Sequence, residues 1–447
     1  MCQHRSMEQT AVTELGLSRF AALRALRRDP IGLLEHAAAR GDVVHTSMPR
    51  AEVFVVNHPD LVWDVFATGN RDFRKSPAAQ AIRRVLGDGL LTSEGELHKQ
   101  QRRLIQPIFH HERIDGYGDA MVAEAEAAAG GLTDRDEVEM HRFMSALSLE
   151  IVGRTLFATD VGGDDAGEVG QALREILSQF GRQFSPWFPL TQKLPLPATR
   201  RFDRAVAVFD RLVYSLIEQR RAHGIDGDDL LSLLLSAQED GVGMSDRQVH
   251  DEALTLFLAG HETTSNALTW TWWFLACHPE AEARLHAELD GVLGGRVPTT
   301  ADLTSLPFTV AVVSESLRLR PPAWAIGRQA IVDHELGGVL LPEGSVAVVS
   351  PWLLHHDERW WPEPNAFRPE RWLDPDPDRP RHAYLPFGGG PRMCIGEGFA
   401  WMEAGLVLAT LARRWRFCLE PDARVEMQPV VTLRPRFGMP MRAHLRP

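Results

Sequence analysis

A long apolar segment near the middle of the chain restricts the possible folds more than any other feature. It begins at SDRQ, where Ser245 and Gln248 have the spacing of a helix capping box, and it continues to His278 and Pro279. At about 1.5 Å per residue, a helix over this segment would be nearly 50 Å long. Because most of its surface is apolar, such a helix must run through the core of a large helical body.

The rest of the sequence predicts a mostly α fold with a small β-sheet region. Apolar residues recur at helical spacing in four further segments, 120–156, 167–184, 198–222 and 279–292. Runs rich in β-branched residues and bounded by turn residues predict short strands at 42–47, 52–57, 326–331 and 345–350. We expect one domain over residues 1–447, with a sheet built from both ends of the chain and an N-terminal extension at about 1–30.

Composition narrows the class of protein. The chain has 447 residues, 44% of them apolar, and a formal net charge of -12, which argues against a nucleic-acid partner. Its cysteines form no CxxC pair, which favours a reducing, cytoplasmic compartment; they are Cys2, Cys277, Cys394 and Cys418. The N-terminal segment has no apolar run long enough for a membrane span or a secretion signal, so we expect no membrane anchor.

The motif AGHETT, residues 259–264, interrupts the long apolar segment. Gly260 removes a side chain, so that another group can approach the backbone, and the Thr263 hydroxyl can bond to the Ala259 carbonyl. Glu262 adds a titratable group that could pass protons into the resulting notch. The alternative is a threonine-capped bend with a surface glutamate.

A second cluster combines SESLRLRPP with NAFRPERW. Glu315 and Arg318 are one helical turn apart and can pair on one face. Taken alone this is weak evidence, because most such pairs are solvated. Arg371 could join them and complete a buried triad.

The segment FGGGPRMCIG, residues 387–396, surrounds Cys394 with glycines and one arginine. A cysteine thiolate is a strong iron ligand that favours O–O cleavage, whereas the commoner role of a lone thiol is structural burial. Glycines allow close approach to a flat macrocycle, and amides of the loop and of the following helix would stabilise a thiolate. Arg392 could pair with an acidic substituent. This composition favours a loop that holds a thiolate on a cofactor.

These motifs resemble those of the cytochrome P450 family. FGGGPRMCIG matches the family's FxxGxRxCxG loop at every fixed position, and AGHETT resembles its acid–threonine motif. Glu315 and Arg318 match its ExxR pair, FRPERW matches its arginine-bearing segment, and all occur in the family's order. The resemblance extends from about residue 41 to the C-terminus. It implies a heme-thiolate monooxygenase, with heme b (iron protoporphyrin IX) as the cofactor and Cys394 as the ligand to iron.

The resemblance also implies roles for further residues. Glu262 and Thr263 would deliver protons for dioxygen activation, and Glu315, Arg318 and Arg371 would form a structural triad. His98 occupies a position where many relatives have tryptophan, although other bacterial members resemble this chain in having histidine. A histidine can donate the same hydrogen bond to a heme propionate as tryptophan does. The remaining residues expected at the heme are Phe387, Gly388, Arg392, Gly396, Arg328, Arg102 and Gly260. His261 we interpret as a core or solvent-edge histidine and not as a ligand.

No flavin or ferredoxin domain is recognisable in the sequence, so the resemblance implies a separate ferredoxin and an NAD(P)H-dependent ferredoxin reductase. Arg113 and the basic clusters HKQQRR (98–103) and RRWR (413–416) are candidates for docking that partner, or are simply solvated surface. We expect a monomer.

The family's substrate pocket maps onto mostly apolar segments, 77–91, 180–196, 256–264, 321–327 and 431–433. Its expected lining offers no charge and favours a hydrophobic substrate; it comprises Leu256, Ala259, Ala323, Trp324, Ala325, Ile326 and Leu433. Trp324 could equally belong to the core. The run 183–197 is either a mobile lid or a surface connector.

The segments AGHETT and HHDERWWPEPNAFRPERW resemble the corresponding segments of bacterial members that oxidise terpenes and lipids. We therefore expect hydroxylation or epoxidation of a terpenoid or another intermediate of secondary metabolism. The alternatives are a peroxide-driven heme-thiolate oxidase, which would be expected to lack the acid–threonine pair, and a non-catalytic heme sensor, which would need no proton-delivery notch.

Overall fold

The computed structural model describes residues 12–157, 172, 175–176, 194, 196–223, 229–239, 242–374 and 376–446. The chain divides into two compact units. The β-rich unit comprises residues 1–80, 323–366 and 376–394. The helical unit comprises residues 81–322, 367–375 and 395–447. That the chain forms a single domain remains a prediction.

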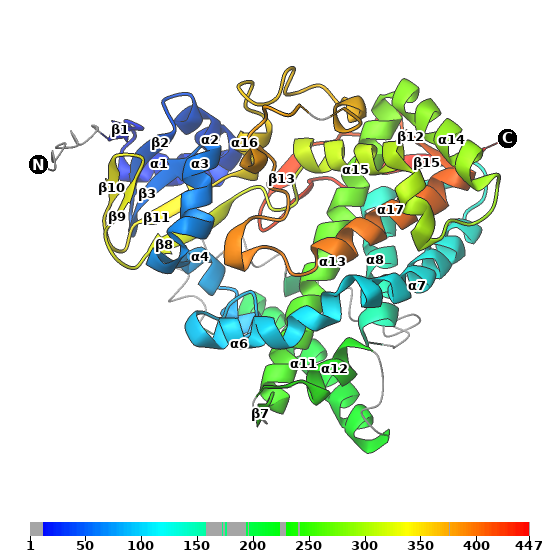
Figure 1. Cartoon of the computed structure of the whole chain (residues 1–447), viewed down its shortest axis with the longest axis horizontal. Helices are drawn as coiled ribbons and strands as arrows, with labels where there is room; N and C mark the ends of the chain where they lie inside the picture. The colour runs from blue at the N-terminus through cyan, green and yellow to red at the C-terminus, as the bar shows by residue number, and fades with distance from the viewer. Residues whose placement is uncertain are drawn as a thin grey trace, which may run out of the picture. The chain divides into compact units, whose positions relative to one another are not determined.

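A six-stranded sheet organises the β-rich unit, in the order β1-β2-β3-β11-β8-β4. Figure 1 shows the blue strands of the N-terminal segment beside the yellow strands from the second half of the chain. β11 runs parallel to β3 and pairs Val348 with Val55, whereas β11 and β8 are antiparallel. The four predicted strands and their origin in distant segments are confirmed; their bounds are β2 Val43–Met48, β3 Ala51–Val56, β8 Ile326–Ala330 and β11 Val346–Val349. The sequence did not indicate the other two strands, β1 Thr13–Glu14 and β4 Phe73–Lys75.

Short elements complete the β-rich unit. One apolar cluster joins sheet residues such as Val56 and Phe73 to Phe66 on the segment after α3, and to Leu336 and Leu341. The elements are α1 Arg19–Arg28, α2 Pro30–Ala38, α3 Pro59–Trp63, η1 Asp64–Thr68, η2 Asn70–Asp72, α4 Pro77–Gln80, β9 His334–Leu336, β10 Val339–Leu341, α16 Pro351–His355, η7 Arg381–Ala383 and η8 Gly390–Arg392.

Helix α13 (Asp246–Cys277) runs through the helical unit, as the sequence predicts (Figure 1). The Ser245 and Gln248 side chains form the expected reciprocal capping box, and His278 ends the helix before Pro279. Most of its side chains are buried. It packs against α8 Met140–Phe157, α11 Pro197–His223, α12 Leu230–Ser236, α15 Pro307–Leu319 and α17 Glu397–Arg414.

The helical periodicity predicted over 120–156 is wrong in one respect, because two helices cover this segment. Helix α7 (His111–Gly130) ends before a turn in which the Asp136 carboxylate accepts hydrogen bonds from Thr133, and strand β5 (Glu137–Glu139) then pairs with β15 (Pro440–Leu445). Pairing with a strand some 300 residues away leaves no signal in local spacing. The helix predicted over 167–184 lies almost wholly outside the described residues.

The helical unit contains several further elements. They are α5 Arg83–Leu86, α6 Gly95–Ile105, η3 Gln106–Phe109, β6 Gln238–Glu239, β7 Val242–Gly243, α14 Pro279–Leu293, η5 Thr300–Ser305, η6 Pro369–Trp372, β12 Trp415–Leu419, β13 Met427–Pro429 and β14 Leu433–Pro435. Within the part of the chain that the structure describes, no helix combines the length and apolar character needed to cross a membrane.

A fully buried carboxylate joins α15 to the segment around η6. Glu315 accepts both Arg318 Nε (2.9 Å) and Arg318 Nη2 (2.8 Å), and its Oε1 also accepts Arg371 Nε at 2.9 Å. The Trp372 indole and the Arg368 backbone N–H donate to the same carboxylate, at 2.9 and 3.0 Å. Glu315 and Arg318 are both 0% exposed, so their charges are compensated by each other and not by water.

Replacing Glu315 by alanine would leave Arg318 buried without its carboxylate, at a cost of about 3–5 kcal/mol of unfolding free energy. We expect Glu315→Ala to unfold at markedly lower denaturant concentration in equilibrium unfolding. The control is Glu370→Ala on the same segment, which removes only a half-exposed pair with Arg284 and should shift stability by less than about 1 kcal/mol. Equal stability of the two variants would contradict the structural role of Glu315.

A second buried acid lies on α17. Glu403 is 0% exposed, and burial raises its pKa to about 8. The carboxyl is therefore protonated at neutral pH in the folded chain. The pKa of Glu403 is higher in the folded chain than its unfolded value near 4.5. The contribution of the protonated carboxyl to stability is therefore complete below about pH 4.5 and is lost as the pH rises through 8.

A neutral amide of the same shape should remove this pH dependence. We expect the stability of Glu403→Gln relative to the wild type to rise with pH from about pH 4.5 and to level off above about pH 8, with a gain of about 3 kcal/mol between pH 6 and pH 9. Thermal unfolding of both proteins across this pH range measures the difference. A gap between the two that does not change with pH would contradict a buried, protonated Glu403.

Candidate functional site

The Cys394 loop in the β-rich unit is closed by its own backbone. The Cys394 N–H donates to Phe387 O at 3.0 Å, and the Met393 N–H donates to Gly390 O at 3.0 Å. Gly388 and Gly390 have φ of 72° and 68°, and a Cβ on Gly390 would lie 1.9 Å from the Phe66 carbonyl. Cys394 itself is exposed. A structural cysteine is normally buried, so an exposed thiol on a fixed glycine loop fits a ligand.

Two guanidinium groups are fixed in the same unit. Arg392 Nη2 donates to Phe73 O at 3.2 Å and Nη1 bonds to Asn70 Oδ1. Arg328 is 8% exposed, and its guanidinium lies over the Phe66 ring at 5.1 Å. One thiol and two arginines in one unit match the chemistry of a metal macrocycle with acidic substituents.

The AGHETT motif lies in the middle of α13. Thr263 Oγ1 donates to Ala259 O at 2.6 Å, as the sequence predicts. Ala259 is exposed and Thr263 is partly exposed, on a helix that is otherwise largely buried. A Cβ on Gly260 would lie 3.2 Å from Val152 Cγ2 on α8, so the missing side chain also eases helix packing. That Gly260 lets a cofactor approach the backbone remains a prediction.

Glu262 is held by residues that sequence reasoning missed. It is 6% exposed, and its Oε1 accepts Thr432 Oγ1 at 2.9 Å and Asn266 Nδ2 at 3.1 Å. Asn266 follows Glu262 by one helical turn, so helical spacing could have suggested it. Thr432 lies 170 residues away, beside β14, and no local pattern indicates it. The surface-glutamate alternative is excluded by this burial.

Three residues to which the sequence analysis assigned a role lie in the helical unit: His98, Arg102 and His261. His98 and Arg102 lie four residues apart on α6, with His98 7% exposed. His261 is 2% exposed, and its Nε2 lies 2.9 Å from Ser145 Oγ. Burial lowers the His261 pKa, so the ring is neutral. His261 is a core histidine, as expected.

The residues predicted to line the substrate pocket differ in exposure. Leu433 was expected there but is 0% exposed; its N–H donates to Pro322 O, and its carbonyl accepts the Trp270 indole at 2.9 Å. It therefore supports the β13–β14 hairpin, while Val431 is the exposed apolar side chain, at 39%. Trp324 is also buried. Ala323, Ala325 and Ile326 are partly exposed, Leu256 is buried, and the segment 180–196 lies almost wholly outside the described residues.

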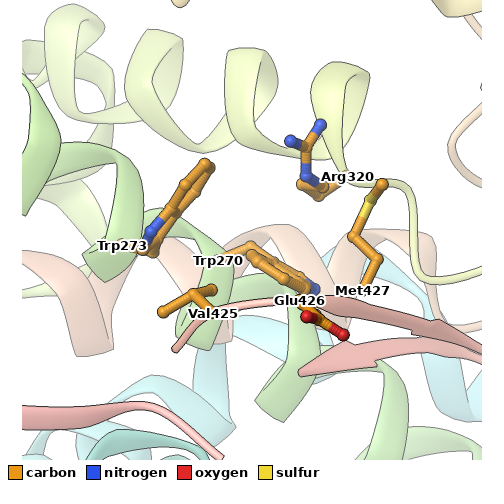
Figure 2. A pocket seen from close by; sticks show the side chains of 6 residues that line it. All are labelled: Trp270, Trp273, Arg320, Val425, Glu426 and Met427. Carbon is orange, nitrogen blue, oxygen red and sulfur yellow. The ribbon is translucent and has the colours of Figure 1, made fainter. Parts of the chain in front are cut away.

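A cavity of about 360 Å³ adjoins the base of this hairpin (Figure 2). Its walls are Trp270, Trp273, Arg320, Val425, Glu426 and Met427. The Arg320 guanidinium lies 5.4 Å from the Trp273 ring centroid, and burial lowers its pKa to about 10. None of the predicted substrate-lining residues contributes to these walls, so this cavity is separate from the predicted pocket.

The comparisons with known proteins decide the family. The family model "Cytochrome P450" matches residues 26–440. The chain belongs to the cytochrome P450 family. It is 41% identical to cyclooctatin synthase of Streptomyces melanosporofaciens, over 94% of this chain and 92% of that protein. It is 39% identical to cyclooctat-9-en-7-ol 5-monooxygenase of the same organism (88% and 86%), and 36% identical to pentalenene oxygenase of Streptomyces avermitilis (91% of each).

This cytochrome P450 is a monooxygenase, and its family carries a heme iron cofactor. The exposed Cys394 and the two fixed arginines of the β-rich unit fit that group. That Glu262 and Thr263 act as the family's acid–threonine pair remains a prediction.

The arginines predicted to dock a redox partner are partly engaged in structural contacts. Arg413 Nη2 bonds to Glu126 at 2.7 Å, and Arg416 Nη2 lies 3.3 Å from Glu282. Arg414 lies over the Trp415 ring. The RRWR arginines therefore have partners within the chain, which the solvated-surface alternative did not anticipate, and their role in partner docking remains a prediction.

Removing the Thr432 hydroxyl should loosen the Glu262 carboxylate without emptying the space that Thr432 fills. We expect Thr432→Val to lower the product formed per NAD(P)H consumed by about two- to tenfold, because a misplaced acid transfers protons less efficiently. Thr432→Ser keeps the hydroxyl and serves as the control. Equal coupling in both variants would show that the Thr432–Glu262 bond does not contribute.

Proposed function

We propose that this P450 uses heme b to insert one oxygen atom from dioxygen into a hydrophobic terpenoid, by hydroxylation or epoxidation. The observation that carries the proposal is the exposed Cys394 on a glycine loop closed by its own backbone. When bound, the heme supplies the iron that activates dioxygen. The balanced reaction consumes the substrate, dioxygen, two electrons and two protons, and yields the oxygenated product and water.

Cys394 would hold the iron through its Sγ atom, with Phe387 packing beside the sulfur. Arg392 and Arg328, together with His98 and Arg102, would bind the heme propionates. Gly388 and Gly396 would let the loop backbone approach the macrocycle. The positive φ of Gly388 supports this role, because a side chain there would strain the loop.

Glu262 and Thr263 would supply the protons. The Glu262 carboxylate is held at Oε1 by Thr432 and Asn266, and the Thr263 hydroxyl is oriented by the Ala259 carbonyl. Thr263 and Ala259 provide the exposed part of an otherwise buried helix. The shielded Glu262 carboxylate and the oriented Thr263 hydroxyl are the two groups that we propose for proton delivery.

An apolar substrate is supported by the residues that remain exposed in the predicted lining segments, among them Val431, Leu91 and Ala259. Two relatives are named for the oxidation of cyclooctat-9-en-7-ol and pentalenene. We propose a terpenoid or a similar intermediate of secondary metabolism, held by shape and not by charge.

We also propose that the electrons come from a ferredoxin and its NAD(P)H-dependent reductase. The enzyme would be a monomer in the cytoplasm. Arg103 and Arg113 are exposed and remain candidates for steering this partner. The buried Glu262 and the oriented Thr263 hydroxyl argue against the peroxide-driven alternative, which needs no proton delivery, and against a heme sensor.

The test is turnover with ferredoxin, ferredoxin reductase, NADPH and isotopically labelled dioxygen. We expect one labelled oxygen atom in the product of a lipophilic terpenoid substrate. Thr263→Ala should keep its heme but divert most of the electrons to hydrogen peroxide. Turnover driven by peroxide alone, with no response to the ferredoxin system, would contradict the proposal.

A further inference from the structure

The loop between α5 and α6 is anchored to the first turns of α13 by two buried carboxylates. The Asp88 N–H donates to Asp251 Oδ2 and the Leu90 N–H donates to Glu252 Oε2, both at 2.8 Å. Asp251 is 4% exposed and Glu252 is 0% exposed. Hydrogen bonds to an ionised acceptor are stronger than neutral ones, and a buried carboxylate is costly unless such bonds stabilise it.

Glycines allow this close contact. A Cβ on Gly87, whose φ is 52°, would lie 2.1 Å from the Asp251 carboxylate. A Cβ on Gly89 would lie 2.1 Å from Thr255 Oγ1 and 2.6 Å from the Asp251 carbonyl oxygen. The sequence Gly-Asp-Gly therefore lets the loop backbone lie directly on the helix.

The loop is also held from its other side. Gln101 Nε2 on α6 donates to Asp88 O at 2.6 Å, and Thr92 Oγ1 donates to Gly87 O at 2.7 Å. Side-chain bonds thus engage the loop backbone at Gly87, Asp88 and Leu90.

His250 connects the anchor to helix α11. Its Nδ1 lies 3.0 Å from Asp251 Oδ1, and its Nε2 lies 3.0 Å from Asp210 Oδ1 on α11. The Tyr214 ring, one turn after Asp210, stacks on the imidazole at a centroid distance of 4.5 Å. Both ring nitrogens therefore face carboxylates, and α11, α13 and the loop share one polar network.

We propose that Asp251 and Glu252 are positioning residues for the substrate. They fix the loop 87–92 so that Leu91, which is 45% exposed directly after the anchored Leu90 N–H, presents a constant apolar surface to the bound molecule. Leu256 follows Glu252 by one helical turn on the same helix. This inference rests on the proposed function and deepens it. The two acids lie ten and eleven residues before Glu262, and they act on the shape of the pocket and not on proton transfer.

Hydrogen exchange measured by mass spectrometry on the peptide covering 86–93 tests the anchor directly. We expect Glu252→Ala to accelerate exchange in this peptide about tenfold, because the Leu90 N–H loses its charged acceptor. Glu252→Gln keeps an oxygen acceptor and should largely restore protection. Glu288→Ala is the matched control, since Glu288 accepts the Phe308 and Thr309 N–H groups in the same way, at 2.7 and 2.8 Å, away from this loop. Unchanged exchange in Glu252→Ala, or an equal change in Glu288→Ala, would overturn the anchor.

A second pair of variants tests the positioning role without removing a buried charge. Gly89→Ala should lift the loop from Thr255, whereas Gly116→Ala places its methyl group in open space on α7. In spectral titrations, we expect Gly89→Ala to weaken binding of 4-phenylimidazole about fivefold and to leave binding of imidazole, which lacks the phenyl ring, unchanged. Gly116→Ala should match the wild type with both probes.

The outcomes separate this inference from the proposed function. A wild-type protein that binds no heme would contradict both. Heme binding with the same ratio of probe affinities in Gly89→Ala and the wild type would contradict the positioning role alone, even if the exchange experiment confirms the anchor.

Discussion

The buried carboxylate of Glu315 is the constraint on which the helical unit depends most clearly. It gathers the Arg318 and Arg371 guanidinium groups, the Trp372 indole and the Arg368 amide around one fully buried charge. Such a charge is tolerated only when its bonds are complete, so the segment 367–372 has few alternatives to its observed path.

Buried acids serve the same purpose elsewhere in this unit, each with a different kind of donor. Asp251 and Glu252 accept backbone N–H groups of the loop 87–92, and Glu262 accepts a hydroxyl and an amide. All three belong to α13, so one helix organises the loop at its start and the proposed proton-delivery site in its middle. Glu403 is the contrast, because burial raises its pKa to about 8 and leaves it neutral. The hydrogen-bonded carboxylates on α13 therefore fix the geometry of the candidate site, whereas the neutral Glu403 is a residue of the core.

The sequence predicted features that arise from local spacing. The capping box of α13, the Thr263–Ala259 bond, the Glu315–Arg318 pair and the strands of the mixed sheet are found where the patterns indicate them. The roles of site residues toward heme were suggested by family resemblance and remain proposals. Contacts between distant segments could not be predicted, because neither partner of a pair such as Thr432 and Glu262 has a distinctive neighbourhood. The same holds for Val152 beside Gly260, and for the burial of Leu433 under the Trp270 bond.

The central claim is that Cys394 is the thiolate ligand of a heme. The most direct measurement is the absorption spectrum of the dithionite-reduced protein with carbon monoxide, for the wild type and for Cys394→Ala. Thiolate ligation predicts a strongly red-shifted Soret band that is present in the wild type and absent in the variant. A wild-type band at the position typical of histidine ligation, or an unchanged band in Cys394→Ala, would contradict the account.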